Sequence, residues 1–380
     1  MAFNLQLNDT ALEHYSNVVN MLPNAWVIRN ELAESQINTF LYREALTELD
    51  FSLGITEGSP ASTAALFLKG RALQGLGQFD AAIETLQSGP VSTQSNVDLM
   101  REIYTELGVI TDIAYFDQLI EEDATNAYAY YFRGLARLAK GNPEGAVVDM
   151  DKISDSDLTV DAWDEVRLNR GYARFKAGLI GKPFHIAEKQ LRENPLNALA
   201  NAYYGEYLTV RGRPELGLSY LEKAILLDPN LGLAHLLRAE ILVSLGSKTA
   251  AKEALHLSDG LNLPTYQNYV ERAYLYTSFG EFDLALSDLR EALQINPDQA
   301  DAYYVRGKTH ATLNDFNSAI DEFTTAIQLD PLNIEYRIRI ALAKARANAV
   351  DYDEALRKLT RPIGNIGDSG ESLEALTVNA

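Results

Sequence analysis

The side chains that most often carry enzyme or metal chemistry are sparse in this chain. Its 380 residues include five histidines and no cysteine, so the sequence offers neither a thiol nor a disulfide. No two histidines have the spacing of a zinc site, and neither a glycine-rich phosphate loop nor a nucleophile elbow is present. The histidines are His14, His185, His235, His256 and His310. The sequence therefore predicts a protein that is not an enzyme and binds no metal or cofactor.

One acidic run resembles a calcium-binding loop in its spacing. It consists of Asp149, Asp151, Asp155 and Asp157. A calcium loop also needs a glycine at its sharp turn and a closing glutamate, and this run has neither. We therefore expect a solvated turn here and not a metal site.

The chain contains a repeat, and this repeat must position every side chain named above. Between residues 171 and 307, small residues recur every 34 positions, and turn-forming residues and prolines keep the same period. One series consists of Gly171, Gly205, Ala239, Ala273 and Gly307, and a second consists of Gly178, Gly212, Gly246, Gly280 and Asn314. The prolines are Pro195, Pro229, Pro297 and Pro331. Such a fixed period indicates stacked repeats.

The pattern inside one period, residues 300–333, predicts two helices. Tyr303 and Gly307 recur at helical spacing in a first helix, and residues 314–315 then interrupt it. A second amphipathic stripe begins at Phe316 and ends before Pro331. One such helix pair is too small to bury its apolar face alone, so it must stack on its neighbours.

This unit resembles the tetratricopeptide repeat family, whose signature is an aromatic residue, a leucine–glycine pair, an aromatic residue, alanine, phenylalanine, alanine and proline. The matching positions here are Tyr303, Arg306, Gly307, His310, Ala319, Phe323, Ala326 and Pro331. The resemblance implies an all-α, right-handed superhelical solenoid of about ten helix-turn-helix repeats. It also makes His310 a core histidine, because that position is normally aromatic.

Arginine often replaces the leucine of the signature. The five examples are Arg133, Arg170, Arg238, Arg272 and Arg306. We expect these arginines to form structural ion pairs with an acidic residue of the second helix, at Asp149, Asp288 or Glu322.

The register divides the chain into five segments, and we expect them to form one elongated array. They are an N-terminal capping helix at 1–25, divergent units at 26–126, regular units at 127–333, a degenerate unit at 334–363 and a polar tail at 364–380.

The charge of the chain limits its partners. Lys and Arg number 33 against 53 Asp and Glu, a net charge of −20. Nucleic acids and anionic membranes need a basic face, so we expect neither as a partner and favour basic proteins instead. No apolar run is long enough to span a bilayer. The N-terminus lacks a basic leader and a continuous apolar stretch, which favours a cytoplasmic protein, although an exported protein without its signal would look the same.

The resemblance also implies where a partner binds. In the family, the fifth and ninth positions of each first helix point into a concave groove. The fifth positions here are apolar or aromatic, and the ninth include two glutamates one unit apart. These features predict a groove for a peptide with apolar anchors and a basic residue. The candidate contacts are Phe67, Tyr128, Tyr131, Tyr172, Tyr203, Glu206, Glu240, Tyr274 and Tyr304. Alternatively, these aromatic residues pack against the adjacent unit.

The predicted function is a non-catalytic scaffold for protein–protein interaction. Two alternatives remain: a regulatory or recognition module of an enzyme complex whose catalytic part lies on another chain or a missing segment, and a self-assembling scaffold. Some family members bind chaperone tails through a carboxylate clamp of lysine, asparagine and arginine. Only Asn169 matches that pattern, so we do not expect this clamp.

Overall fold

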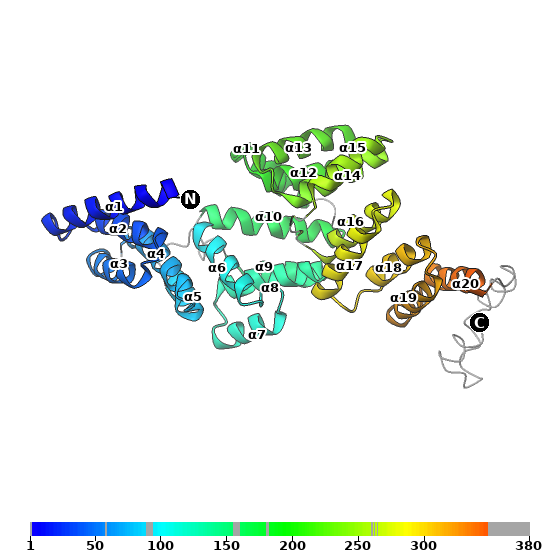
Figure 1. The fold of residues 1–380 in the computed structure, drawn as a ribbon, viewed down its shortest axis with the longest axis horizontal. Helices are drawn as coiled ribbons and strands as arrows, with labels where there is room; N and C mark the ends of the chain where they lie inside the picture. Colours follow the sequence, from blue (N-terminus) through cyan, green and yellow to red (C-terminus); the bar gives the residue numbers. More distant parts are fainter. Residues whose placement is uncertain are drawn as a thin grey trace. The chain divides into compact units, whose positions relative to one another are not determined.

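The computed structural model describes residues 2–57, 59–88, 94–154, 160–179, 182–259, 261, 263 and 265–348. Within these residues every regular element is an α-helix, and there are twenty of them (Figure 1). The all-α repeat fold expected from the sequence is confirmed. The chain divides into two compact units, which we describe separately.

Unit 1 comprises Met1–Arg137 and Pro143–Pro183. Its helices are α1 (Ala2–Met21), α2 (Trp26–Asn38), α3 (Tyr42–Thr56), α4 (Ser62–Gly75), α5 (Phe79–Gln87), α6 (Gln94–Glu106), α7 (Ile113–Glu122), α8 (Ala127–Ala139), α9 (Pro143–Met150) and α10 (Val160–Lys176). The core is rich in aromatic side chains. The Tyr104 ring meets those of Phe116 and Phe132 edge-on, with centroids 5.1 and 4.9 Å away.

Unit 2 comprises Leu138–Asn142 and Phe184–Ala380. Its helices are α11 (Lys182–Glu193), α12 (Ala198–Val210), α13 (Pro214–Leu227), α14 (Gly232–Ser244), α15 (Lys248–Leu257), α16 (Tyr266–Phe279), α17 (Phe282–Ile295), α18 (Ala300–Thr312), α19 (Phe316–Leu329) and α20 (Ile334–Asn348). The division into five segments stays a prediction, and residues 349–380, including the polar tail, lie outside the described residues.

The helix boundaries of unit 2 follow the 34-residue period. The first helices α12, α14, α16, α18 and α20 begin at residues 198, 232, 266, 300 and 334, and the second helices α13, α15, α17 and α19 begin at 214, 248, 282 and 316. The turn residues Gly212, Gly246, Gly280 and Asn314 have φ angles of 73°, 79°, 80° and 63°. This left-handed conformation ends each first helix and favours glycine or asparagine, which explains why these residues recur.

The recurring small residues lie where two helices of a pair approach closely. A Cβ atom added to Gly307 of α18 would come within 2.6 Å of the Phe323 ring on α19. One added to Gly205 of α12 would come within 2.9 Å of the Gly217 carbonyl oxygen on α13. A larger side chain at either position would force the helices apart, so the small residues set the helix spacing.

The expected ion pairs are confirmed for three of the five signature arginines. In three units, the signature arginine donates hydrogen bonds to the carboxylate that lies sixteen residues later on the second helix, at 2.6–3.0 Å. The pairs are Arg133–Asp149, Arg272–Asp288 and Arg306–Glu322. The Arg272–Asp288 pair is buried, and burial raises the pKa of Asp288 although Arg272 opposes the rise. These pairs tie the two helices of a unit together.

Candidate peptide-binding surface

In the acidic run that resembles a calcium loop, Asp149 and Asp151 form ion pairs with arginines. Asp149 is buried and binds Arg133 and Arg137, so the expectation of a solvated turn is wrong for this residue. Burial demands a partner for the carboxylate, and the arginines supply it. Asp151 contacts Arg174 at 2.8 Å. Residues 155 and 157 lie outside the described part of the chain.

The described residues bear on two other classes of function. They contain no group of three His, Cys, Asp or Glu residues that could hold a metal ion. None of their helices is both long and apolar enough to cross a membrane.

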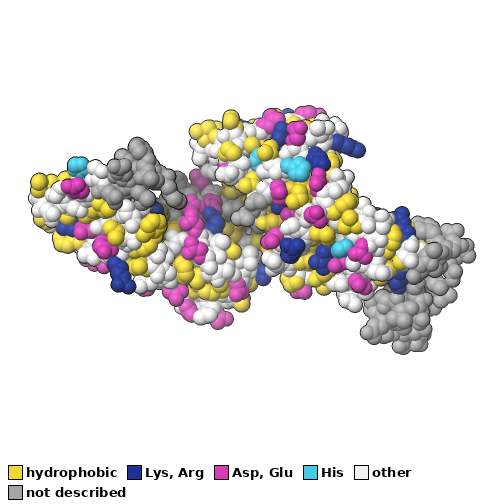
Figure 2. All heavy atoms as spheres, in the orientation of Figure 1, with side chains coloured by type: hydrophobic (Ala, Val, Ile, Leu, Met, Phe, Trp, Pro, Cys, Tyr) yellow, Lys and Arg dark blue, Asp and Glu magenta, His cyan; other side chains and the backbone are white. Residues whose placement is uncertain are grey.

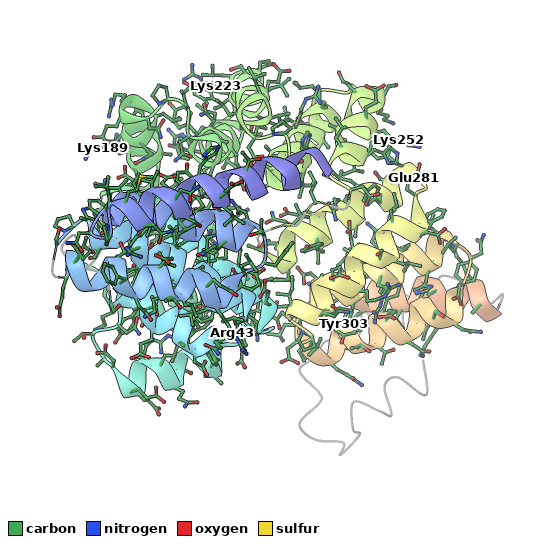
Figure 3. The ribbon with its side chains drawn as sticks, turned by 60° about the vertical axis from the view of Figure 1, so that its left-hand side comes forward. Arg43, Lys189, Lys223, Lys252, Glu281 and Tyr303 are labelled. Carbon is green, nitrogen blue, oxygen red and sulfur yellow. The ribbon has the colours of Figure 1, made fainter. Side chains whose placement is uncertain are left out.

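Charges of both signs lie on the surface of the chain. Figure 2 shows acidic and basic side chains interspersed with hydrophobic ones over the visible face. Some charges are paired between neighbouring repeats. The Nζ atom of Lys252 on α15 lies 2.5 Å from Oε1 of Glu281, which precedes α17 (Figure 3). The pairing lowers the pKa of Glu281, because the ammonium favours the ionised carboxylate. The surplus negative charge is therefore interleaved with cations on this face.

The structure places the nine candidate contacts in three environments. Five are buried: Tyr128, Tyr131, Tyr172, Tyr203 and Glu206. Three are half-buried: Phe67, Glu240 and Tyr304. Tyr274 stands apart, with 48% of its surface exposed. Their role as ligand contacts stays a prediction, but only the last two groups present surface to a partner in this conformation.

In unit 1, Tyr131 of α8 is fully buried, and its hydroxyl group forms two hydrogen bonds. Its hydroxyl donates to Glu165 of α10 and accepts from Asn169, whose Nδ2 lies 2.9 Å from it. Arg101 of α6 binds the same glutamate. Burial, and then the charge of Glu165, raise the pKa of the Tyr131 phenol well above its usual value. The hydroxyl therefore stays protonated, and the side chain serves packing.

In unit 2, three side chains from two neighbouring first helices form what we call the tyrosine–lysine surface. It consists of Tyr274 on α16 and Tyr304 and Lys308 on α18. The Lys308 Nζ lies 4.3 Å from the centroid of the Tyr274 ring and 5.6 Å from that of Tyr304. The ammonium thus lies near both aromatic rings, an arrangement that attracts the cation and restrains all three side chains.

Tyr304 also contacts two residues of α20, the first helix of the next repeat. Its hydroxyl donates to Glu335 of α20 at 3.0 Å, and its ring packs on that of Tyr336 with centroids 5.0 Å apart. Arg339 donates to the same glutamate at 2.9 Å. The hydrogen bonds from Arg339 and Tyr304 lower the pKa of Glu335. Glu335 therefore stays ionised near neutral pH and fixes both partners.

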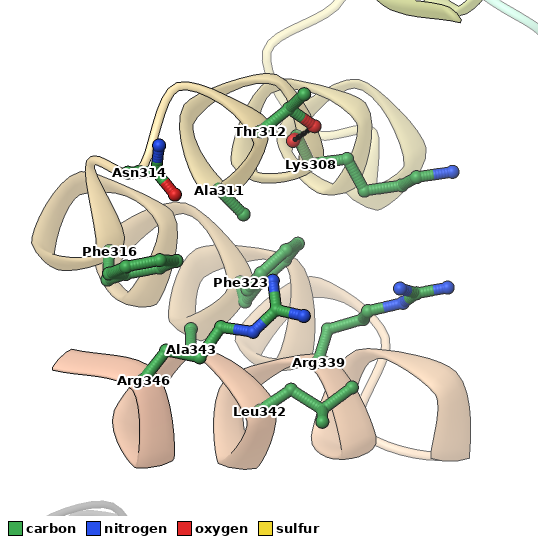
Figure 4. A pocket seen from close by; sticks show the side chains of 10 residues that line it. All are labelled: Lys308, Ala311, Thr312, Asn314, Phe316, Phe323, Arg339, Leu342, Ala343 and Arg346. Carbon is green, nitrogen blue, oxygen red and sulfur yellow. Dashed lines mark hydrogen bonds between the residues drawn. The ribbon is translucent and has the colours of Figure 1, made fainter. Parts of the chain in front are cut away.

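A pocket of about 340 Å³ adjoins this surface, between α18, α19 and α20 (Figure 4). Its apolar lining consists of Ala311, Phe316, Phe323, Leu342 and Ala343, and its remaining lining consists of Lys308, Thr312, Asn314, Arg339 and Arg346. Sequence reasoning did not identify this pocket. The available signal was the basic residues between positions 308 and 346 of an acidic chain, but the convergence of three of them depends on how α20 packs against α18 and α19.

Family models match two separate stretches of the chain. Models of the tetratricopeptide repeat match residues 63–88 and 300–333, and a model described as TPR repeat matches residues 273–314. The first stretch lies in unit 1 and the others lie in unit 2.

Several curated proteins are similar over part of their length. Over 211 residues, which make up 50% of this chain and 40% of the relative, the chain is 27% identical to DnaJ homolog subfamily C member 3 of Gallus gallus. Over 77 residues, 20% of this chain and 15% of the relative, it is 38% identical to the tetratricopeptide repeat and J domain-containing co-chaperone DNJ1 of Cryptococcus neoformans. The chain spans less than half the length of the curated relatives it matches.

One of the solved structures that the chain resembles is that of the APC/C hetero-tetramer Cut9–Hcn1. It is 16% identical, with a TM-score of 0.47, over 94% of this chain and 85% of that one. Because the 34-residue period, the helix pairs and the matched stretches agree, this chain carries tetratricopeptide repeats in both units.

Proposed function

We propose that this chain is a non-catalytic scaffold that binds a peptide segment or partner protein, with the tyrosine–lysine surface of unit 2 as a principal contact. The repeats and the co-chaperone relatives support an interaction role. The observation that carries the proposal is Tyr274, a half-exposed aromatic side chain restrained by Lys308. The cytoplasmic location of the protein stays a prediction from the sequence.

The chemistry of this surface suits peptide binding. Tyrosine rings supply a large contact area with few rotatable bonds, so little conformational entropy is lost when they bind. Tyr304 is already fixed by Glu335 and Tyr336, which lowers the entropic penalty further. A partner with apolar anchors would bury the exposed parts of both rings.

The acidic side of the groove adds a second element to the proposal. Glu240 on α14 is half-buried, whereas Glu206 on α12 is buried. We propose that Glu240 faces a basic side chain of the partner, and that this contact contributes more to association rate than to affinity.

A selection experiment tests the proposed function. A phage-displayed library of random dodecapeptides would be selected on the immobilised full chain, and enriched peptides would be measured by fluorescence anisotropy. We expect Tyr274→Ala to weaken their binding at least about tenfold, because buried aromatic anchors dominate such interfaces. Leu226→Ala is the matched control, since this side chain of α13 is 82% exposed and outside the surface.

Two results would contradict the proposal. One is the absence of any enriched peptide. The other is a set of peptides whose affinity is unchanged by Tyr274→Ala and Tyr304→Ala, which would move the interface elsewhere. Growth of the particle mass with concentration in light scattering would favour the self-assembling scaffold instead.

A further inference from the structure

The pocket between α18, α19 and α20 is basic, although the chain as a whole is acidic. Three of its ten lining residues are cations, and none is a carboxylate. They are Lys308, Arg339 and Arg346. In a chain with a net charge of −20, this concentration of positive charge around one pocket sets the pocket apart.

The three cations differ in how far they are already neutralised. Arg339 forms an ion pair with Glu335 at 2.8 Å, and Lys308 interacts electrostatically with the same glutamate. Within the described residues, neither Lys308 nor Arg346 has a carboxylate within 4.0 Å, and Lys308 is held by aromatic faces instead. Glu335 therefore interacts with two of the three cations and Arg346 with none of the described carboxylates, so the pocket keeps unneutralised positive charge.

The rest of the lining is apolar. Phe316, Phe323 and Leu342 present hydrocarbon surface beside the cations, as the close-up in Figure 4 shows. Its volume of about 340 Å³ is at the small end of ligand sites and fits a few side chains. A charge-assisted hydrogen bond gains strength beside such apolar walls, because water competes less well there.

We propose that this pocket binds the carboxylate of an aspartate or glutamate side chain in a partner peptide, with apolar residues on either side of it. The inference deepens the proposed function and rests on it. Charge complementarity selects the acidic side chain, and the Phe316–Phe323–Leu342 lining selects its apolar neighbours. Lys308 links the two features, since it belongs both to the pocket and to the tyrosine–lysine surface.

The test uses the full chain with labelled alanine and leucine methyl groups, observed by NMR. The probe is the acetylated and amidated peptide Ser-Leu-Phe-Glu-Leu-Phe-Ser, and its counterpart carries Gln in place of Glu. We expect the glutamate peptide to shift the methyl signals of Ala311, Leu342 and Ala343. We also expect it to bind at least about tenfold more tightly than the glutamine peptide.

Variants of the chain assign the preference to the pocket. Lys308→Gln combined with Arg346→Gln should remove the difference between the two peptides. Lys248→Gln, which changes an exposed lysine of α15, should preserve it. Glu335→Gln should instead tighten the glutamate peptide, because it removes the carboxylate that competes for Arg339 and Lys308. This gain of binding cannot arise from a variant that merely fails to fold.

Other outcomes would overturn the inference. Equal affinity for the two peptides would show that the pocket selects no carboxylate; if that binding still depended on Tyr274, the proposed function would stand. A tight complex with a glutamine peptide that ends in a free carboxylate would assign the pocket to a chain terminus. Binding that emerges only after Asp351, Asp353 and Glu354 are changed to amides would identify the chain's own C-terminal segment as the occupant.

Discussion

The two units use the same tyrosine–glutamate hydrogen bond but leave different amounts of tyrosine exposed. Tyr131 and Tyr304 both occupy the fifth position of a repeat, and each donates its hydroxyl to a glutamate of the next first helix. These acceptors are Glu165 in unit 1 and Glu335 in unit 2. Tyr131 is nevertheless fully buried, whereas Tyr304 is half-buried.

The difference lies in where the partner arginine comes from. In unit 1, Tyr131 lies on α8, the first helix of a helix pair. Arg101 lies on α6, the first helix of the preceding pair, and binds Glu165 on α10, the first helix of the following pair. In unit 2, Arg339 lies one helical turn after Glu335 on the same helix, α20. An ion pair that spans three successive first helices encloses the tyrosine between them, whereas an ion pair within one helix leaves it accessible. A repeat position alone therefore does not decide whether a side chain forms core or surface.

The largest effect we expect comes from matched tyrosine truncations. Tyr172 and Tyr274 both occupy ninth positions, but the first is buried and the second is 48% exposed. Tyr172→Ala should lower the free energy of unfolding by about 3–5 kcal/mol, as for other buried aromatic residues. Tyr274→Ala should change it by about 0.5 kcal/mol or less. Urea unfolding followed by circular dichroism measures both, and equal losses would contradict the comparison.

An overpacking experiment asks whether the open surface of unit 2 simply reflects loose helices. Ala285 and Ala326 are fully buried on α17 and α19. Ala285→Leu or Ala326→Leu should lower the free energy of unfolding by about 1–3 kcal/mol, because a dense interface cannot absorb three more carbon atoms. Gln294→Ala, at an exposed position of α17, is the control and should be nearly silent. Melting points that match the parent chain for both leucine variants would show that unit 2 is loosely packed.

A smaller effect should follow when the arginine of unit 1 is removed. The Arg101 side chain is 35% exposed, so its ion pair is partly screened by solvent. Arg101→Gln should therefore reduce stability by about 1 kcal/mol or less. The variant should also make Tyr131 react faster with hydroxyl radicals, as detected by mass spectrometry, while Tyr304 stays unchanged. If Tyr131 remained as protected as in the parent chain, Arg101 would not be what encloses it.

Local sequence rules were sufficient to predict the repeat. The period, the positive φ angles at Gly212 and Asn314, the small residue at Gly307 and the Arg272–Asp288 pair all depend on contacts within one helix pair. Such contacts recur with the sequence period, so the period reveals them.

The accessible surface could not be predicted in the same way. Burial of Tyr131 depends on Arg101 and Glu165. These two residues lie 64 positions apart, and neither belongs to the repeat signature. The basic pocket depends on α20 bringing Arg339 and Arg346 beside Lys308. Both arrangements join side chains from several units, and a repeat signature records only what one unit contains.

Hydroxyl-radical footprinting of the full chain, with and without a peptide selected from the library, tests the central claim most directly. Without peptide, Tyr274 should be oxidised much faster than Tyr131 and Tyr172, because its ring is exposed and theirs are buried. With peptide, oxidation of Tyr274 and Tyr304 should fall while that of Tyr131 and Tyr172 stays the same. Protection of Tyr131 and Tyr172 with no change at Tyr274 would contradict the account and return the binding surface to unit 1.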